Sequence, residues 1–260
     1  MLRFLFSGFY LFILGFSGFS CDAFAQSKDK SRECSAVDRP CLMKKIETLV
    51  PNIEKSEWKD QTLRELAKTY TYEGEPDKAI ALIERITDND TKAMTIRGIG
   101  MAAASMKWEK HRYDSLFAKL ASQAAIISHK PSQGIAYTYI AMAQAFAGDD
   151  ESARRTASTM DNAALRNKAY GETAEIDADR GDLKNALLSM NAIDSPAYRN
   201  KQYDIISRIF LDKAMLEEAY ACASRIDNAY LKAKSIQRIL NKGNAEEEDM
   251  EPKADVTKDF

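Results

Sequence analysis

The sequence predicts an all-α fold in which helix–turn–helix repeats stack into an α-solenoid, and three observations lead to this expectation. The 260 residues are 45% hydrophobic and 29% charged, as in ordinary globular proteins, and include only 11 Gly and 6 Pro, few for a protein of many strands. Apolar residues recur at the helical spacings of three, four and seven. Ungapped copies of one segment follow each other at a constant spacing, at Gly148–Asn162, Gly181–Ser195 and Ala214–Asn228, and Gly74–Asp88 is a further copy upstream.

The stretch 1–25 predicts a secretory signal peptide. Arg3 gives a positive start, residues 4–19 are mostly apolar and aromatic, and Ala23-Phe24-Ala25 is a small-x-small cleavage site. We therefore expect cleavage after Ala25, export to a bacterial periplasm and no stable membrane span in the mature chain.

Two other interpretations of this region stay open. A transmembrane anchor would need about 20 apolar residues, more than this stretch offers. A lipoprotein anchored at Cys21 would need an aliphatic residue just before the cysteine, and residues 18–20 supply none. Signal cleavage remains the leading expectation.

The segment 26–57 is expected to hold a disulfide and a short capping helix. Cys34 and Cys41 are seven residues apart, and in an oxidising compartment their pairing is the simplest one. Asp38 can cap a helix that tolerates a proline in its first turn. The stretch 41–53 is in register with 74–86, and this helix would present Leu42, Ile46 and Leu49 on one face.

The array 58–240 is expected to hold about five and a half units of about 33 residues. Each first helix has a large residue and, four positions later, a small one, as in Leu63/Ala67, Ile96/Gly100, Tyr137/Ala141, Tyr170/Ala174 and Tyr203/Ser207. Seven residues later comes the turn, at Gly74, Lys107, Gly148, Gly181 and Ala214. Small residues then open the second helices at Ala79, Ala153, Ala186 and Ala219.

Two parts of the array are irregular. The second unit carries eight extra residues after Lys107, and its second helix is expected over Trp108–Ser128. The stretch Tyr230–Leu240 is a first helix without a second one, which suggests a closing cap. Residues 241–260 are acidic, and we expect a disordered tail there.

This pattern resembles the tetratricopeptide repeat, a helix–turn–helix unit of about 34 residues with a large residue, a small residue, a Gly-containing turn and an Ala in fixed phase. The chain differs in its slightly shorter period, in lacking the closing proline and in having Arg112 where Ala is expected. The resemblance extends over the whole array 58–240. It implies a right-handed solenoid that binds other proteins.

The resemblance also implies a concave groove, lined by the second, fifth, ninth and thirteenth residues of each unit. In the first unit these are Gln61, Arg64, Lys68 and Tyr72. The apolar, Met-rich centre, an adaptable surface, gives the candidate binding residues Met94, Arg97, Met101, Ile135, Thr138, Met142 and Phe146. The alternative is that the long second helix of the second unit covers this patch.

Other chemistry is weakly supported. Enzyme motifs are absent, His111 and His129 are interpreted as exposed polar residues, and Cys222 as a lone buried thiol. No cofactor and no metal are expected. A formal net charge of -2 gives no reason to expect nucleic acid as a partner.

A basic column recurs at the start of the first helices, at Lys59, Lys92, Arg166, Arg199 and Lys232, with Gln133 as the exception. Contacts between neighbouring repeats, with Asp161, Asp194 and Asp227 as candidate partners, are the favoured interpretation. An anion-binding ridge is the alternative.

The leading functional hypothesis is a periplasmic adaptor that binds a protein or peptide in its groove and is not an enzyme. The alternative is a structural envelope component that acts by self-association, as a homo-oligomer, or by contact with the cell wall or a membrane.

Overall fold

The computed structural model describes residues 34–242, and about 77% of them are helical, with no strand in that range. The stretch expected to be a signal peptide, Cys21 and nearly all of the expected acidic tail fall outside the described residues. The chain divides into two compact units between Leu42 and Met43.

In the compact unit that ends at Leu42, the predicted cysteine pair is confirmed. The Sγ atoms of Cys34 and Cys41 lie 2.04 Å apart, at disulfide distance. Helix α1 (Arg39–Leu49) begins beside them, and the Asp38 carboxylate accepts a hydrogen bond of 3.1 Å from the Cys41 N–H, as expected of a capping residue. The bridge therefore closes a small loop around the start of the helix.

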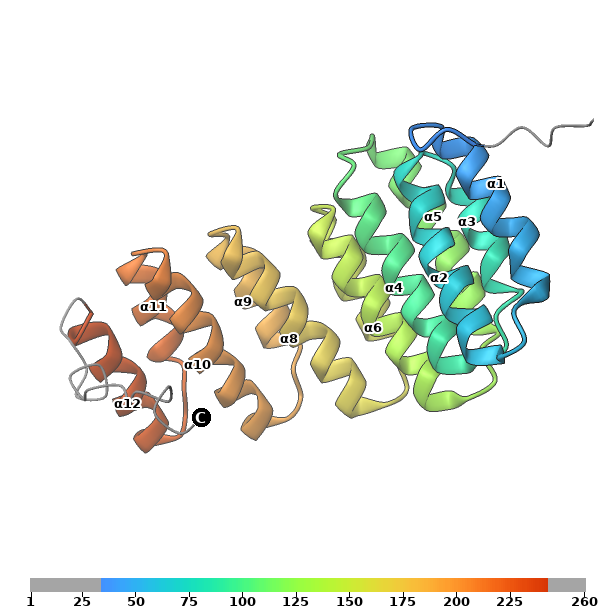
Figure 1. Ribbon diagram of the computed structural model, residues 1–260. Coiled ribbons are helices and arrows are strands. Elements are labelled where there is room, and N and C mark those ends of the chain that lie inside the picture. Colours follow the sequence, from blue (N-terminus) through green and yellow to red (C-terminus); the bar gives the residue numbers. More distant parts are fainter. Residues whose placement is uncertain (1–33, 243–260) are drawn as a thin grey trace, which may run out of the picture. The chain divides into compact units, whose positions relative to one another are not determined.

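Beyond Leu42, after a 3₁₀ turn at Val50–Asn52, first helices alternate with second helices, which are shorter except in the second repeat. The first helices are α2 (Ser56–Tyr72), α4 (Asn89–Ala104), α6 (Lys130–Phe146), α8 (Ala163–Asp179), α10 (Pro196–Asp212) and α12 (Ala229–Leu240). The second helices are α3 (Pro76–Ile83), α5 (Lys110–Ala125), α7 (Asp150–Ser158), α9 (Leu183–Asn191) and α11 (Leu216–Ala223). Each first helix packs against the next first helix along the chain, and the row can be followed in Figure 1.

The turns confirm the phase of the repeat. The residues with positive φ in the described part of the chain are the predicted turn positions Gly74, Lys107, Gly148, Gly181 and Ala214. At four of them the N–H of the turn residue and that of the next residue bond back to the last helical carbonyls, the left-handed ending that stops a helix. At the Lys107 turn, the N–H of the next residue, Trp108, bonds to a side chain instead of a helical carbonyl. The Tyr113 hydroxyl oxygen accepts this hydrogen bond at 2.9 Å.

The core is built from the predicted positions. The small residues Ala67, Ala79, Ala141 and Ala153 have no exposed area, as do their equivalents Ala174, Ala186 and Ala219. Small side chains at these crossings let paired helices approach closely. In α1, however, Met43 is buried, whereas Ile46 and Leu49 of the expected apolar face are 37% and 53% exposed.

In three units, a polar side chain of the first helix binds the loop that starts the next unit. The Asp60 carboxylate accepts hydrogen bonds from the Thr87 and Asp88 N–H groups. Asn167 and Asn200 act in the same way, accepting from the Asp194 and Asp227 N–H groups at 3.1 and 2.9 Å.

Three side chains of the basic column make contacts that stabilise the fold. Arg166 donates to the Met160 carbonyl at 2.9 Å and pairs with Asp194 at 2.7 Å, and Arg199 donates to the Ile193 carbonyl at 3.3 Å. Gln133, the exception in the column, donates to the Ala125 carbonyl at 2.8 Å. These side chains bond to carbonyls at or just beyond the end of the preceding second helix, which favours the structural interpretation over an anion-binding ridge.

Candidate functional site

A surface cavity of about 390 Å³ lies between α2 and α4. Its lining residues are Arg64, Glu65, Lys68, Tyr72, Met94, Arg97, Gly98, Met101 and Ala102. The repeat phase brings these side chains together, because equivalent positions on adjacent first helices face the same side. The mapped positions Arg64, Lys68 and Tyr72 and the candidate residues Met94, Arg97 and Met101 therefore meet in one place, which we call the α2–α4 cavity.

The cations of this cavity differ in how they are held. The Arg64 guanidinium pairs with the Glu65 carboxylate at 2.9 Å. Lys68 and Arg97 instead lie near aromatic rings, with the Lys68 ammonium 6.0 Å from the Tyr72 ring centre and the Arg97 guanidinium 5.5 Å from the Tyr139 ring centre. Within residues 34–242 no carboxylate pairs with either, so their positive charge is left for a ligand.

The apolar part of the cavity comes from the two methionines and the tyrosine. Met94 and Met101 are half-buried, and Met101 also packs against the core of the first repeats. Tyr72 is 42% exposed. Methionine side chains are flexible and polarizable, and they adapt to partners of different shape.

The four candidate residues on α6 lie outside this cavity. Ile135 and Met142 are half-buried and pack against the core clusters, and Phe146 is exposed. Thr138 is buried, with 2% of its area exposed, and its hydroxyl donates to the Gly134 carbonyl at 3.1 Å. The expectation that Thr138 belongs to an open binding surface is therefore wrong, because this short side chain fills the contact between neighbouring first helices.

Sequence reasoning missed Tyr139, whose ring lies beside Arg97. A signal was available, since Tyr139 occupies the repeat position that is Gly98 in the previous unit. A large aromatic ring that follows a unit with glycine at the same position is expected to reach across to the preceding helix.

The long second helix of the second unit leaves the cavity open. Helix α5 packs against α3, α4 and α6, and none of its residues lines the α2–α4 cavity. Two of its polar contacts reach α3 and the residue after it, through the Lys119–Asp77 pair at 2.5 Å and a hydrogen bond of 3.2 Å from Gln123 to Glu84.

A larger depression of about 490 Å³ lies between α5 and α7. Its charged groups are already paired with one another. Lys110 bonds both Asp114 and Asp149, at 2.8 and 3.1 Å, and Arg155 bonds Glu151 at 2.9 Å. A ligand would have to break these pairs, so this depression is a weaker candidate than the α2–α4 cavity.

His129 is exposed, as the sequence predicted, and it also has a hydrogen-bond partner. Its Nδ1 lies 2.6 Å from the Ser132 hydroxyl, which in turn donates to Asp90. In a hydrolytic triad the histidine stands between the serine and the acid, whereas here the serine is in the middle and is fully buried. This cluster therefore joins the start of α6 to α4 and does not form a nucleophile site.

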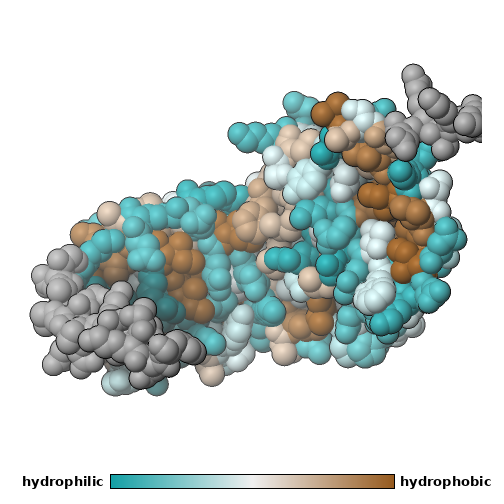
Figure 2. Space-filling model, viewed as in Figure 1, coloured by the Kyte–Doolittle hydropathy of each residue, from teal (hydrophilic) through white to brown (hydrophobic). Residues whose placement is uncertain are grey.

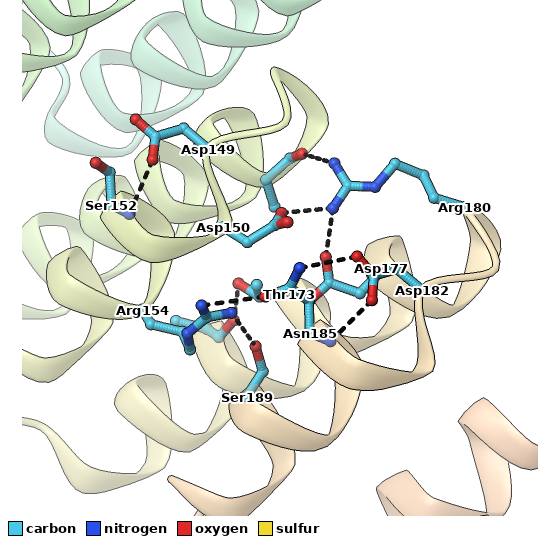
Figure 3. A network of polar contacts seen from close by, with 12 residues as sticks. Asp149, Asp150, Ser152, Arg154, Thr173, Asp177, Arg180, Asp182, Asn185 and Ser189 are labelled. Atoms are coloured by element: carbon cyan, nitrogen blue, oxygen red, sulfur yellow. Dashed lines mark hydrogen bonds and ion pairs between the residues drawn. The ribbon is translucent and has the colours of Figure 1, made fainter.

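A buried polar network joins α6, α7 and α8 (Figure 3). The Arg180 guanidinium, at the end of α8, donates to the Ala145 carbonyl at 2.6 Å and pairs with Asp150 and Asp177 at 2.5 Å each. Asp177 has no exposed area. Burial, together with the neighbouring Asp150 carboxylate, raises the pKa of Asp177 to about 7. The network is closed to solvent on the Asp177 side, which suits a structural clamp.

Two further features match what the sequence predicted: the burial of the Cys222 thiol and the character of the helices. Cys222 is fully buried, and burial raises the pKa of its thiol to about 12, so the thiolate is suppressed at neutral pH. Across residues 34–242, no helix combines the length and the apolar character that crossing a membrane requires.

Comparisons with protein-family models, with curated proteins and with solved structures found no match.

Proposed function

We propose that this chain is an exported helical-repeat adaptor that binds a segment of another protein in the α2–α4 cavity. The observation that carries the proposal is the composition of the cavity, in which Met94, Met101 and Tyr72 offer apolar contact. Beside them lie the cations Lys68 and Arg97, which have no carboxylate partner among residues 34–242. A peptide with an apolar side chain flanked by one or two carboxylates matches this surface.

The solenoid arrangement is part of this proposal. The constant repeat phase, the turns at matching positions and the row of first helices support a tetratricopeptide-like stack, in which α2, α4 and α6 line one face. Peptide binding to such a face needs no large conformational change, because the lining side chains are already in place.

Export to a bacterial periplasm is supported by two features. The stretch 1–25 has the pattern of a cleavable signal, and Cys34 and Cys41 lie at disulfide distance. A role in assembling or maintaining the cell envelope follows from that address.

The adaptor proposal is tested by reversing the free charges of the cavity. Lys68 and Arg97 are exposed, so Lys68→Glu and Arg97→Glu should leave helix content and thermal unfolding unchanged. A photo-crosslinking residue placed at Tyr72 in the native host should capture a discrete partner, and the two charge reversals together should reduce that capture by about tenfold or more, as loss of two charge-assisted contacts would.

The matched control is Lys201→Glu, an exposed lysine at the position of Met94 in a later unit. It should leave capture unchanged. Equal capture by the doubly reversed chain, or equal loss in the control, would contradict binding in the α2–α4 cavity.

A further inference from the structure

Within residues 34–242, the helix row begins with a second helix that has no first helix before it, and ends with a first helix that has no second helix after it. Helix α1 is in register with α3, a second helix, but in the described chain no first helix precedes it. Helix α12 is a first helix, and residues 34–242 contain no second helix after it. The described part of the molecule therefore begins with half a repeat and finishes with the other half.

No first helix among residues 34–242 covers the apolar side chains of α1. Ile46 and Leu49 occupy the repeat positions of Ala79 and Leu82 in α3. In α3 these residues are packed under α2, with 0% and 3% of their area exposed, whereas Ile46 and Leu49 are 37% and 53% exposed. The difference is what the absence of a covering helix produces.

A depression of about 400 Å³ marks the vacant position, between α1 and α2. It is lined by Ile46, Trp58, Gln61, Thr62, Glu65, Leu66 and Thr69. Figure 2 shows hydrophobic side chains gathered in this region, between α1 and α2. Trp58, at 57% exposure, is the largest side chain left uncovered there.

The same positions in later helices are the ones that contact the preceding first helix. Trp58 corresponds to Leu165, whose side chain packs so closely on Gly134 that a Cβ there would lie 2.5 Å from it. Thr62 corresponds to Gln202, which packs in the same way on Gly171. The α2 face is thus shaped to meet a first helix that residues 34–242 do not supply.

The outer face of α12 is the complementary surface. Ala233 and Gln237 hold the repeat positions of Gly134 and Gly171, and Leu240 follows on the same face. All three are exposed, and Leu240 has 73% of its area in contact with solvent.

We propose that α12 of one copy docks in the depression between α1 and α2 of a second copy, so that two half repeats complete each other. Ala233 would then lie against Trp58 of the other copy, Gln237 beside Thr62 and Glu65, and Leu240 against Ile46. Helix α12 has no carboxylate, and while Arg238 is held by Asp204, Lys232 and Lys234 remain for a groove edge that presents the exposed Glu65 carboxylate beside its partner Arg64.

This contact joins different surfaces of the two copies, so each added copy leaves one end free. Such a head-to-tail interface builds an open chain of copies, or a ring if the geometry closes. Leu240 and Ile46 are larger than the Ser and Ala that meet at the equivalent internal crossing of Ser207 and Ala219. The helices are therefore further apart than inside a chain, and association should be reversible and depend on concentration. The inference does not depend on peptide binding in the α2–α4 cavity.

Light scattering and sedimentation of the purified protein test the proposal. The wild-type protein should change from monomer towards dimer and larger species as its concentration rises from micromolar to millimolar. Trp58→Glu should hold it at a single copy, and so should Ala233→Glu, because each places a charge in the apolar contact. Both positions are exposed, so circular dichroism and thermal unfolding should be unchanged.

A mixture of the two variants gives the decisive result. The Ala233→Glu chain keeps an intact α1–α2 depression and the Trp58→Glu chain keeps an intact α12, so together they should form a 1:1 dimer that grows no further. Leu188→Glu, which charges an exposed leucine on α9, is the control and should associate like wild type. A wild-type protein that stays monomeric at every concentration, or two variants that fail to pair, would overturn the proposal.

Discussion

At the scale of single residues, backbone strain is concentrated at two turns. Lys107 and Ala214 adopt φ values of 51° and 61°, whereas the other three turns use glycine. The left-handed conformation costs an L-residue about 1–2 kcal/mol, because its Cβ approaches the following carbonyl oxygen. Ala214 nevertheless makes the same two backbone hydrogen bonds as Gly181, through its own N–H and that of Met215. The turn is therefore fixed by the repeat, and the side chain is tolerated.

Replacing Ala214 with glycine should stabilise the protein. The substitution removes the left-handed strain and adds some freedom to the unfolded chain, so the free energy of unfolding should rise by about 0.5–1 kcal/mol in urea titrations. The matched change Ala118→Gly, in the middle of α5, should instead cost about 1 kcal/mol, because glycine is a poor helix former. Destabilisation by Ala214→Gly would contradict a strained turn.

At the scale of a single element, α4 holds two glycines with opposite surroundings. A Cβ added at Gly98 would meet the Lys68 Cβ at 3.9 Å, an ordinary contact, whereas one at Gly100 would lie 2.8 Å from the Ala143 Cβ. Gly100 is therefore required by the close approach of α4 and α6, and Gly98 is not.

We expect Gly98→Ala to stabilise the protein by up to about 1 kcal/mol, from helix propensity alone. Gly100→Ala should destabilise it by about 1–3 kcal/mol, the usual cost of overpacking, since the helices must move apart. Thermal or urea unfolding of the two variants measures both effects. Equal effects at the two positions would show that helix propensity, and not the α4–α6 approach, governs α4.

The repeat phase explains which elements could be predicted from the sequence. It located the turns, including those at Lys107 and Ala214, and the buried small residues, because these depend only on position within a unit. It could not decide how deep Thr138 lies. Its repeat position falls at the contact between neighbouring first helices, where the long Arg64 and Arg97 reach solvent and a short threonine stays buried.

At the scale of the whole molecule, neighbouring repeats are coupled by buried or half-buried polar groups as well as by the apolar core. Asp60, Asn167 and Asn200 each bind the loop of the next unit, and the Asp204 carboxylate accepts a hydrogen bond of 3.0 Å from Arg238 of α12. Such contacts cannot be predicted from one repeat alone, because both partners come from different units. They also make the stability of the array sensitive to the ionisation of buried acids.

The raised pKa of Asp177 lets us predict how the stability of the array depends on pH. Its pKa is about 7 in the folded protein and near 3.8 in the unfolded chain, so between these values the folded state binds more protons. The free energy of unfolding should therefore fall as pH rises from about 4 to about 7, and level off above that. A single group can contribute at most about 1.4 kcal/mol for each pH unit over this range. Carboxyls whose pKa is lowered, such as Asp88, act in the opposite direction only below about pH 4.

Urea titrations between pH 4.5 and 8 measure this slope, and Asp177→Asn tests its origin. The amide keeps an oxygen for Arg180 and carries a donor that can reach Asp150, so it imitates the protonated acid. The variant should be more stable than wild type at about pH 8 and should lose the Asp177 part of the slope, because it has no proton to release there; Glu175, whose pKa burial also raises, keeps its own contribution. Ser158→Ala, an exposed change at the end of α7, should keep the wild-type slope. If the asparagine variant keeps the wild-type slope as well, the proton is taken up at another group. The Asp150–Asp177 pair around Arg180 would then not govern how the stability of this repeat junction depends on pH.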